Sequence, residues 1–122
     1  MAERKEFYKQ LKLFLRELVV VFPENDDDLL TITTSINLSM MDDDCDEIRI
    51  KFYNALKVAE TEILARDSGI FNNACAFNWK KSTYEYELFD KLHRRWDTFT
   101  YNDKNVIWDY IILLYRLSKI IR

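Results

Sequence analysis

Apolar residues recur at three- and four-residue steps along almost the whole chain, which is the spacing of amphipathic helices. The first helix is predicted from about residue 2 to residue 22, with an apolar stripe at Phe7, Leu11, Phe14, Leu15, Leu18 and Phe22. The opposite side carries Arg4, Lys5, Lys9, Lys12, Arg16 and Glu17. The stripe widens at Val19, Val20 and Val21, so we expect this end to be buried more fully. Pro23 ends the helix, because the residue before a proline disfavours helical geometry.

Two further helices are expected before residue 66. The shorter one spans about 28–40, with inward positions Leu29, Ile32, Ile36 and Met40. Its threonines and serines are poor helix formers, so a strand is the competing interpretation. The next helix starts near Asp44 and Glu47, which have the spacing of a capping box, and runs to about Ala65. Its inward positions are Ile48, Phe52, Ala55, Leu56, Ala59 and Ile63.

Residues 66–81 form the least regular part of the chain, and connections of this length are often functional. Gly69 follows the third helix, where a left-handed residue is commonly needed. Packing of this segment on the body of the protein is indicated by Ile70, Phe71, Phe77 and Trp79.

Two more helices complete the chain. A capping box at Ser82 and Glu85 starts the fourth, whose inward positions are Leu88, Phe89, Leu92, Trp96 and Phe99. The fifth starts at residues 100–103, with Val106, Ile107, Tyr110, Ile111, Leu114, Leu117 and Ile121 inward. The chain has one Gly and one Pro in 122 residues, so sheets with tight turns are disfavoured. We predict an all-α, single-domain antiparallel bundle of about five helices.

Charge is segregated along the chain, although the formal net charge is only −3. Between Glu24 and Ile48 there is no Lys or Arg, but there are nine acidic residues. They form two clusters, Glu24 with Asp26, Asp27 and Asp28, and Asp42, Asp43, Asp44, Asp46 and Glu47. Helix capping plus solvated surface is one interpretation of both clusters. Docking onto a basic partner is the other.

Surplus aromatic residues are the second indication of a binding surface. Aromatics make up 15% of the chain, more than one small core needs. Several tyrosines fall off or at the margins of the apolar stripes, and protein-binding surfaces use exposed aromatics. They are Tyr8, Tyr53, Tyr84, Tyr86, Tyr101 and Tyr115.

The composition argues against several classes of protein. The mildly acidic net charge is not typical of a nucleic-acid-binding protein. Cys45 and Cys75 have no Cys or His at metal spacing, so free thiols in a reducing compartment are expected. The N-terminus lacks an apolar signal core, and no apolar run approaches the ~18 residues of a membrane span. We therefore expect a cytoplasmic protein without a metal, cofactor or membrane anchor.

Two candidate chemical sites are weak. Asp42, Asp44 and Asp46 have the alternating spacing that opens a calcium loop, but the sixth position is Glu47 rather than Gly and the twelfth is Tyr53. His93 is the only histidine and lies among cations, so a surface histidine is the expected interpretation. No nucleophile elbow or glycine-rich loop accompanies it, so a small helical enzyme is a distant alternative.

The region 79–96 offers a nucleic-acid alternative. Its cations are Lys80, Lys81, Lys91, Arg94 and Arg95, and its aromatics are Trp79, Tyr84, Tyr86 and Trp96. Cations with exposed aromatics bind single strands through phosphate contacts and base stacking. Most of these aromatics are also suited to a core.

A resemblance appears in three stretches. Residues 14–23 (FLRELVVVFP), 63–71 (ILARDSGIF) and 102–110 (NDKNVIWDY) resemble segments of an uncharacterised family of small helical proteins from large DNA viruses of algae and amoebae. The resemblance implies a viral gene product, located in the particle or in the host cytoplasm. It carries no activity and no functional residue, and the acidic middle of this chain departs from the lysine-rich family pattern.

These observations together favour a non-enzymatic protein-interaction or structural protein, with a viral particle component or host-interaction factor as the specific forms. The expected partner is a protein with a basic surface, or a second copy of the chain; nucleic acid is the alternative. The residues expected to bind the partner are Asp26, Asp27, Asp28, Asp42, Asp43, Asp44, Asp46, Glu47, Phe71 and Trp79.

Overall fold

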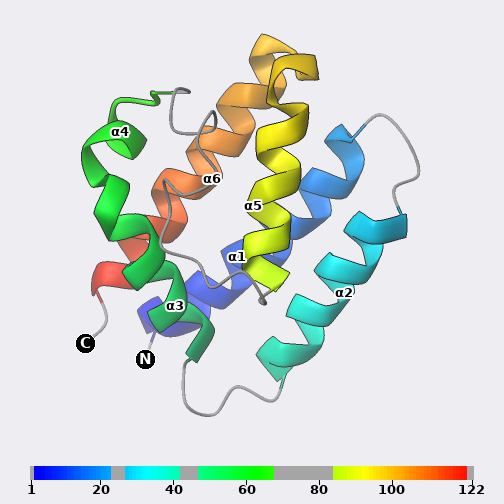
Figure 1. Cartoon of the computed structure of the whole chain (residues 1–122). Helices are drawn as coiled ribbons and strands as arrows, with labels where there is room; N and C mark the ends of the chain where they lie inside the picture. Colours follow the sequence, from blue (N-terminus) through cyan, green and yellow to red (C-terminus); the bar gives the residue numbers. More distant parts are fainter. Residues whose placement is uncertain (1, 23–26, 42–46, 68–83, 121–122) are drawn as a thin grey trace.

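The computed structural model describes residues 2–22, 27–41, 47–67 and 84–120, and all regular structure in these ranges is helical. The elements are α1 (Ala2–Val21), α2 (Asp27–Met41), α3 (Glu47–Leu56), a 3₁₀ turn (Lys57–Ala59), α4 (Glu60–Leu64), α5 (Tyr84–Arg95), a second 3₁₀ turn (Trp96–Thr98) and α6 (Tyr101–Ile120) (Figure 1). The all-α prediction is confirmed, and residues 27–41 are a helix rather than a strand. The antiparallel order of the whole bundle stays a prediction.

Several sequence-based predictions fall outside the described residues. They concern Pro23, Asp26, Asp42, Asp43, Asp44, Cys45, Asp46, Gly69, Ile70, Phe71, Cys75, Phe77, Trp79, Lys80, Lys81, Ser82 and Ile121.

The apolar stripe of α1 lies at the centre of the packing. Its six predicted core residues are all buried, and α1 packs on α6, α2 and α3. The expectation for the valines was wrong: Val20 is 72% exposed and Val19 is 37% exposed. Consecutive helical residues are about 100° apart, so three in a row cannot all face the same side. Leu18 and Phe22 take the inward positions at this end, and Val20 points the other way.

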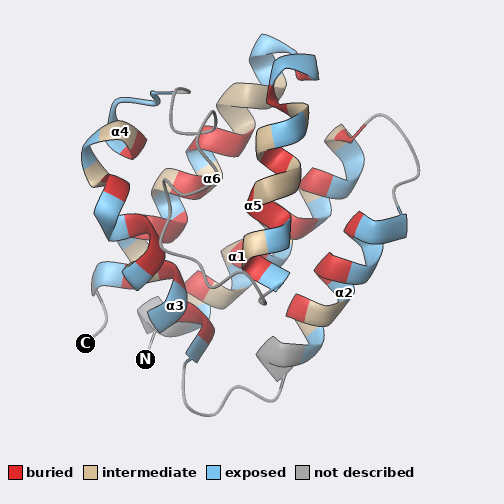
Figure 2. Ribbon diagram, viewed as in Figure 1, coloured by how far each residue is buried: buried red, intermediate tan, exposed pale blue. Residues whose placement is uncertain are grey.

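Helix α2 lies along the edge of the molecule beside α5, and the two run in opposite directions (Figure 1). Three of its four predicted inward residues, Leu29, Ile32 and Ile36, are buried, and the side chain of the fourth, Met40, lies outside the described residues. In Figure 2 the buried positions of α2 lie on one side of the helix and its exposed positions on the other. One long side of α2 is therefore open to solvent.

The third predicted helix is divided in two. A 3₁₀ turn at Lys57–Ala59 separates α3 from α4, and no Gly or Pro marks the break in the sequence. Despite the break, all six predicted inward residues are buried. Both pieces pack on α6.

The end of α4 corrects the expectation for Gly69. Arg66 takes the left-handed conformation, with φ of 54°. The amide of Arg66 donates to the carbonyl of Ile63 at 3.1 Å, and the amide of Asp67 donates to the carbonyl of Glu62 at 2.8 Å. These two bonds form a Schellman motif, which usually has glycine where Arg66 stands. The helix end therefore comes three residues before the glycine.

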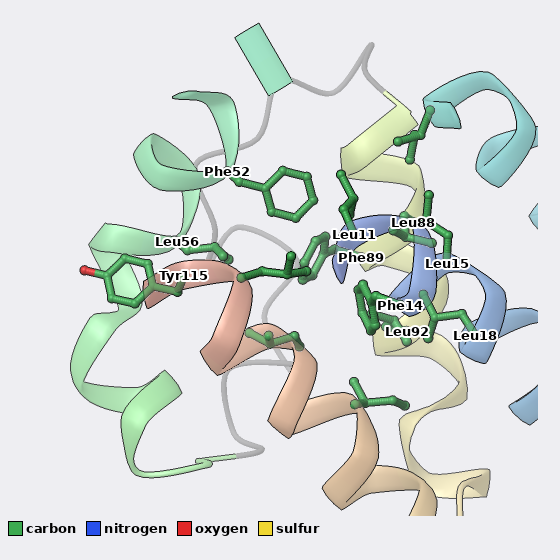
Figure 3. Close-up of a cluster of buried hydrophobic side chains, with 14 of the residues drawn as sticks. Leu11, Phe14, Leu15, Leu18, Phe52, Leu56, Leu88, Phe89, Leu92 and Tyr115 are labelled. Atoms are coloured by element: carbon green, nitrogen blue, oxygen red, sulfur yellow. The ribbon is translucent and has the colours of Figure 1, made fainter. Parts of the chain in front are cut away.

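Phe52 of α3 joins three helices in the core (Figure 3). It is fully buried, and its ring packs edge-on against Phe7 of α1 at 5.7 Å and Phe89 of α5 at 6.4 Å between centroids. Tyr115 of α6 was expected at the margin but is only 3% exposed. Its hydroxyl points away from the apolar side chains in Figure 3, so the ring fills the core while the polar end reaches its rim.

Two polar contacts fix the ends of α6. At its start, which lies where the sequence predicted it, the Thr100 hydroxyl accepts a bond from the Asp103 amide at 3.1 Å and caps the helix. At its end, Arg49 of α3 donates from Nη1 to the Ser118 carbonyl at 2.6 Å. Arg49 is only 5% exposed, and its amide donates to the Tyr8 hydroxyl at 3.4 Å. A buried cation thereby meets the negative end of the α6 dipole and links α3, α1 and α6.

Candidate interaction surface

The solvent-facing side of α2 is the most unusual surface in the described residues. No charged residue occurs from Leu29 to Met41. Leu30 is 45% exposed, Leu38 is 58% exposed, and the exposed Thr34 lies between them at four-residue spacing. These three residues are called the α2 outer face. Solvent-exposed helices normally carry charged residues on such a face, so an uncharged one with two leucines is typical of a docking surface.

Acidic residues lie at the start of α2 and at the start of the next helix. Asp27 and Asp28 are exposed in the first turn of α2, and Glu47 is exposed at the first residue of α3. They complement the positive ends of their own helix dipoles, so a capping role accounts for their positions. The other acidic residues of the two clusters lie outside the described residues. Sequence analysis missed the apolar strip of α2 that follows Asp27 and Asp28. Its signal was the thirteen-residue stretch without charge.

A cleft of about 480 Å³ runs between α2 and α5. Three acidic and three cationic side chains line the cleft, and Ile32 is its apolar residue. Arg94 pairs with Asp90 at 3.1 Å across one turn of α5. The lining is Asp28, Thr31, Ile32, Glu87, Asp90, Lys91, Arg94 and Arg95. Because the charges are balanced, the cleft suits a surface of mixed charge better than a small ion of one sign.

The basic and aromatic region of α5 does not form a stacking platform in the described residues. Trp96 is 4% exposed and packs edge-on against Trp108 at 5.7 Å between centroids. Lys104 Nζ lies over the Trp96 ring, 5.8 Å from its centroid. Tyr84 is 44% exposed, and Tyr86 is half-buried. A buried tryptophan cannot stack on a base, which removes one of the four aromatics on which the nucleic-acid alternative depended.

His93 was expected at the surface but is half-buried. Its Nδ1 atom is buried and has no hydrogen-bond partner among the described residues. Across the same part of the chain, no group of three or more His, Cys, Asp or Glu side chains could hold a metal ion. The described surroundings of His93 therefore supply neither a metal site nor an orienting bond of the kind a catalytic base uses.

Stacked tyrosines and charges join α3 and α4 to α6. The rings of Tyr53 and Tyr115 stack 6.3 Å apart at 5°. The Tyr115 hydroxyl donates to Glu60 Oε1 at 2.9 Å, and Lys119 Nζ donates to the same oxygen at 3.2 Å. Burial, with the bond to Glu60, raises the pKa of Tyr115 to about 12. The Tyr115 bond, and then Lys119, lower the pKa of Glu60. A phenol held neutral in this way acts as a structural donor.

The remaining tyrosines divide by position. Tyr101 is 80% exposed at the start of α6, whereas Tyr8 and Tyr53 are half-buried against the core. The six tyrosines expected off or at the margins of the apolar stripes therefore range from exposed to buried. The exposed aliphatic residues are spread over several helices of the described chain: Val19 and Val20 on α1, Leu30 and Leu38 on α2, Ile50 on α3, Val58 in the first 3₁₀ turn, Leu64 on α4 and Leu113 on α6.

Comparison of the chain with protein-family models, curated proteins and solved structures gives no match. None of the described helices is long and apolar enough to cross a membrane.

Proposed function

We propose that this protein is a non-enzymatic interaction protein that binds another protein through the α2 outer face. The observation that carries the proposal is the pair of exposed leucines, Leu30 and Leu38, on a helix without charge along thirteen residues. Burying two such side chains provides affinity through the hydrophobic effect. Asp27 and Asp28, exposed in the first turn of α2, then select the partner by charge.

The partner surface follows from this chemistry. It carries an apolar strip for the leucines, with Lys or Arg beside it to meet Asp27, Asp28 and Glu47. Such rim charges mainly set the association rate and its salt dependence, while the central apolar contacts set the lifetime of the complex. The complex should therefore form more slowly at high salt.

Affinity purification with matched variants tests the proposal. The tagged protein is recovered from its native cells, and bound proteins are identified by mass spectrometry. Leu30→Gln/Leu38→Gln removes the apolar strip but keeps good helix formers. Leu64→Gln/Leu113→Gln is the control, because these leucines are 46% and 37% exposed on α4 and α6. We expect the first variant alone to lose the partner; equal recovery by both variants would contradict the proposal.

Charge reversal tests the role of the acidic residues at the start of α2 separately from that of the leucines. Replacing Asp26, Asp27 and Asp28 together by lysine should weaken partner recovery. The helical content should stay largely unchanged, because Asp27 and Asp28 are exposed. The resemblance to viral proteins makes capsid or core proteins and host factors the two partner classes to distinguish. Nucleic-acid machinery that is lost on nuclease treatment would instead support the alternative.

A further inference from the structure

A single row of cations runs along the solvent-facing side of α1. Its members are all exposed and recur at steps of three and four residues: Lys5, Lys9, Lys12 and Arg16. At 3.6 residues per turn they lie within an arc of about 60° and extend about 16 Å along the helix axis. No acidic residue of α1 falls inside this arc. These four residues are called the α1 cationic row.

The α1 cationic row has no anionic partner within the described residues. Most other described cations do have a contact. Arg66, Arg94 and Lys119 each pair with a carboxylate, and Lys57 and Lys104 lie over aromatic rings. The row also contains two pairs of like charges four residues apart, an arrangement that destabilises a helix. A ligand that supplies carboxylates along the row would remove this cost.

The shape of the row favours an acidic helix of another protein as its ligand. Cations in single file match carboxylates that recur at three- and four-residue steps on one side of a helix, as charged positions pair between the helices of a coiled coil. Val19 and Val20 are 37% and 72% exposed at the end of the row, each about 20° outside one edge of the arc. They offer an apolar contact that a protein side chain can use and a phosphate backbone cannot.

The flank of the row disfavours nucleic acid. Glu6 and Glu17 both lie on one flank, about 60–80° from the edge of the arc. The Glu6 carboxylate accepts a bond from Gln10 Nε2 at 2.8 Å, which holds it on that flank. A wide polyanion would meet these carboxylates, whereas a single row of Asp or Glu would not. None of the aromatics of α1 is exposed, so the helix presents no ring on which a base could stack.

We propose that the α1 cationic row is a second docking surface, separate from the α2 outer face, and that it binds an acidic amphipathic helix of another protein. Carboxylates at three- and four-residue spacing on that helix meet the four cations, and an apolar residue beyond them packs on Val19 and Val20. The ion pairs form at exposed positions, so the association is weak and falls with added salt.

Fluorescence anisotropy of a labelled peptide, titrated with the full chain, tests the proposal. The probe is an alanine-rich helix with four glutamates at three- and four-residue spacing on one side, followed by two leucines. A control peptide of the same composition has its glutamates spread around the helix. The row variant is Lys12→Gln/Arg16→Gln, and its control, Lys51→Gln/Arg116→Gln, removes one Lys and one Arg at exposed positions of α3 and α6. We expect the dissociation constant of the probe to rise about threefold to thirtyfold in the row variant only.

An exchange of charges gives the most specific result. Lys12→Glu/Arg16→Glu should release the probe and bind instead a peptide with lysine in place of the two facing glutamates. Circular dichroism checks that each variant remains helical.

Three results would overturn the proposal. They are equal binding of the two glutamate peptides, equal losses in the row and control variants, and no saturable binding of the probe. A short DNA duplex or phosphatidylserine vesicles that bind through Lys12 and Arg16 in place of the peptide would also overturn it and assign the row to phosphate groups. The variants at Leu30 and Leu38 test the proposed function separately, so either proposal can fail while the other stands.

Discussion

The left-handed backbone conformation of Arg66 lowers the stability of the folded protein, and substitutions at this position can measure the effect. Its φ of 54° is unfavourable for a residue with a Cβ atom by roughly 1–2 kcal/mol. Its side chain offsets part of this cost, because Arg66 pairs with Asp109 and donates to Asn105 Oδ1 at 3.1 Å. The side chains of the ion pair are 39% and 66% exposed, so the pair contributes about 0.2–1 kcal/mol.

Two substitutions separate the side chain from the backbone. Arg66→Ala loses the contacts and keeps the left-handed cost, so we expect it to destabilise by about 0.5–1.5 kcal/mol. Arg66→Gly loses the same contacts but removes the left-handed cost. About 0.4–1 kcal/mol of this gain is offset by the greater conformational freedom of glycine in the unfolded chain. The glycine variant should therefore be more stable than the alanine variant by about 0.5–1 kcal/mol.

Urea unfolding monitored by circular dichroism measures both free energies. Ala65→Gly is the matched control, because Ala65 is one residue earlier with φ of −85° and needs no glycine. There we expect glycine to lower the stability by about 0.5–1 kcal/mol. If Arg66→Gly is no more stable than Arg66→Ala, the left-handed backbone of Arg66 carries no cost that glycine relieves. Asp109→Ala combined with Arg66→Ala should further give a coupling energy of about 0.2–1 kcal/mol.

Three other predictions concern the core and the tyrosine cluster. The folded-state pKa of Tyr115 is raised to about 12 from 10.0. The stability that its neutral side chain contributes to the fold is therefore complete below pH 10 and is lost as the pH rises toward 12. Tyr115→Phe should flatten this part of the unfolding free-energy profile, and an unchanged slope would contradict the assignment. The lowered pKa of Glu60 contributes stability above its ordinary value of 4.5 that is lost as the pH falls through the folded-state pKa. Glu60→Gln should therefore reduce acid sensitivity in the same titration, whereas parallel curves would argue against the Tyr115 and Lys119 contacts. Phe52→Ala should cost about 3–5 kcal/mol by urea unfolding, and a loss below about 1 kcal/mol would mean that Phe52 does not join the three helices.

Periodicity predicted the helices well because core positions repeat with the helical turn. The stripe of α1 and the inward residues of α5 are buried as expected. The break between α3 and α4 was missed, since a 3₁₀ turn still carries helical spacing and no Gly or Pro marks it. Tyr115 was misplaced because an amphipathic ring suits both a margin and a core.

The candidate surface was harder to predict than the fold. Charge counts identified the acidic clusters, but only the helix phase shows that Leu30 and Leu38 face outward between them. The same phase turns Val20 outward beside the cations of α1. Exposure of an apolar residue depends on which neighbouring helix covers it, and this depends on packing that a single sequence does not specify.

Photo-crosslinking from position 38 tests the central claim most directly. A photoreactive amino acid in place of Leu38, and separately in place of Leu64 as a control, is introduced into the full chain in its native cells. We expect a covalent protein adduct from position 38 and none from position 64. Absence of any adduct from position 38, or equal crosslinking from both positions, would contradict binding through the α2 outer face.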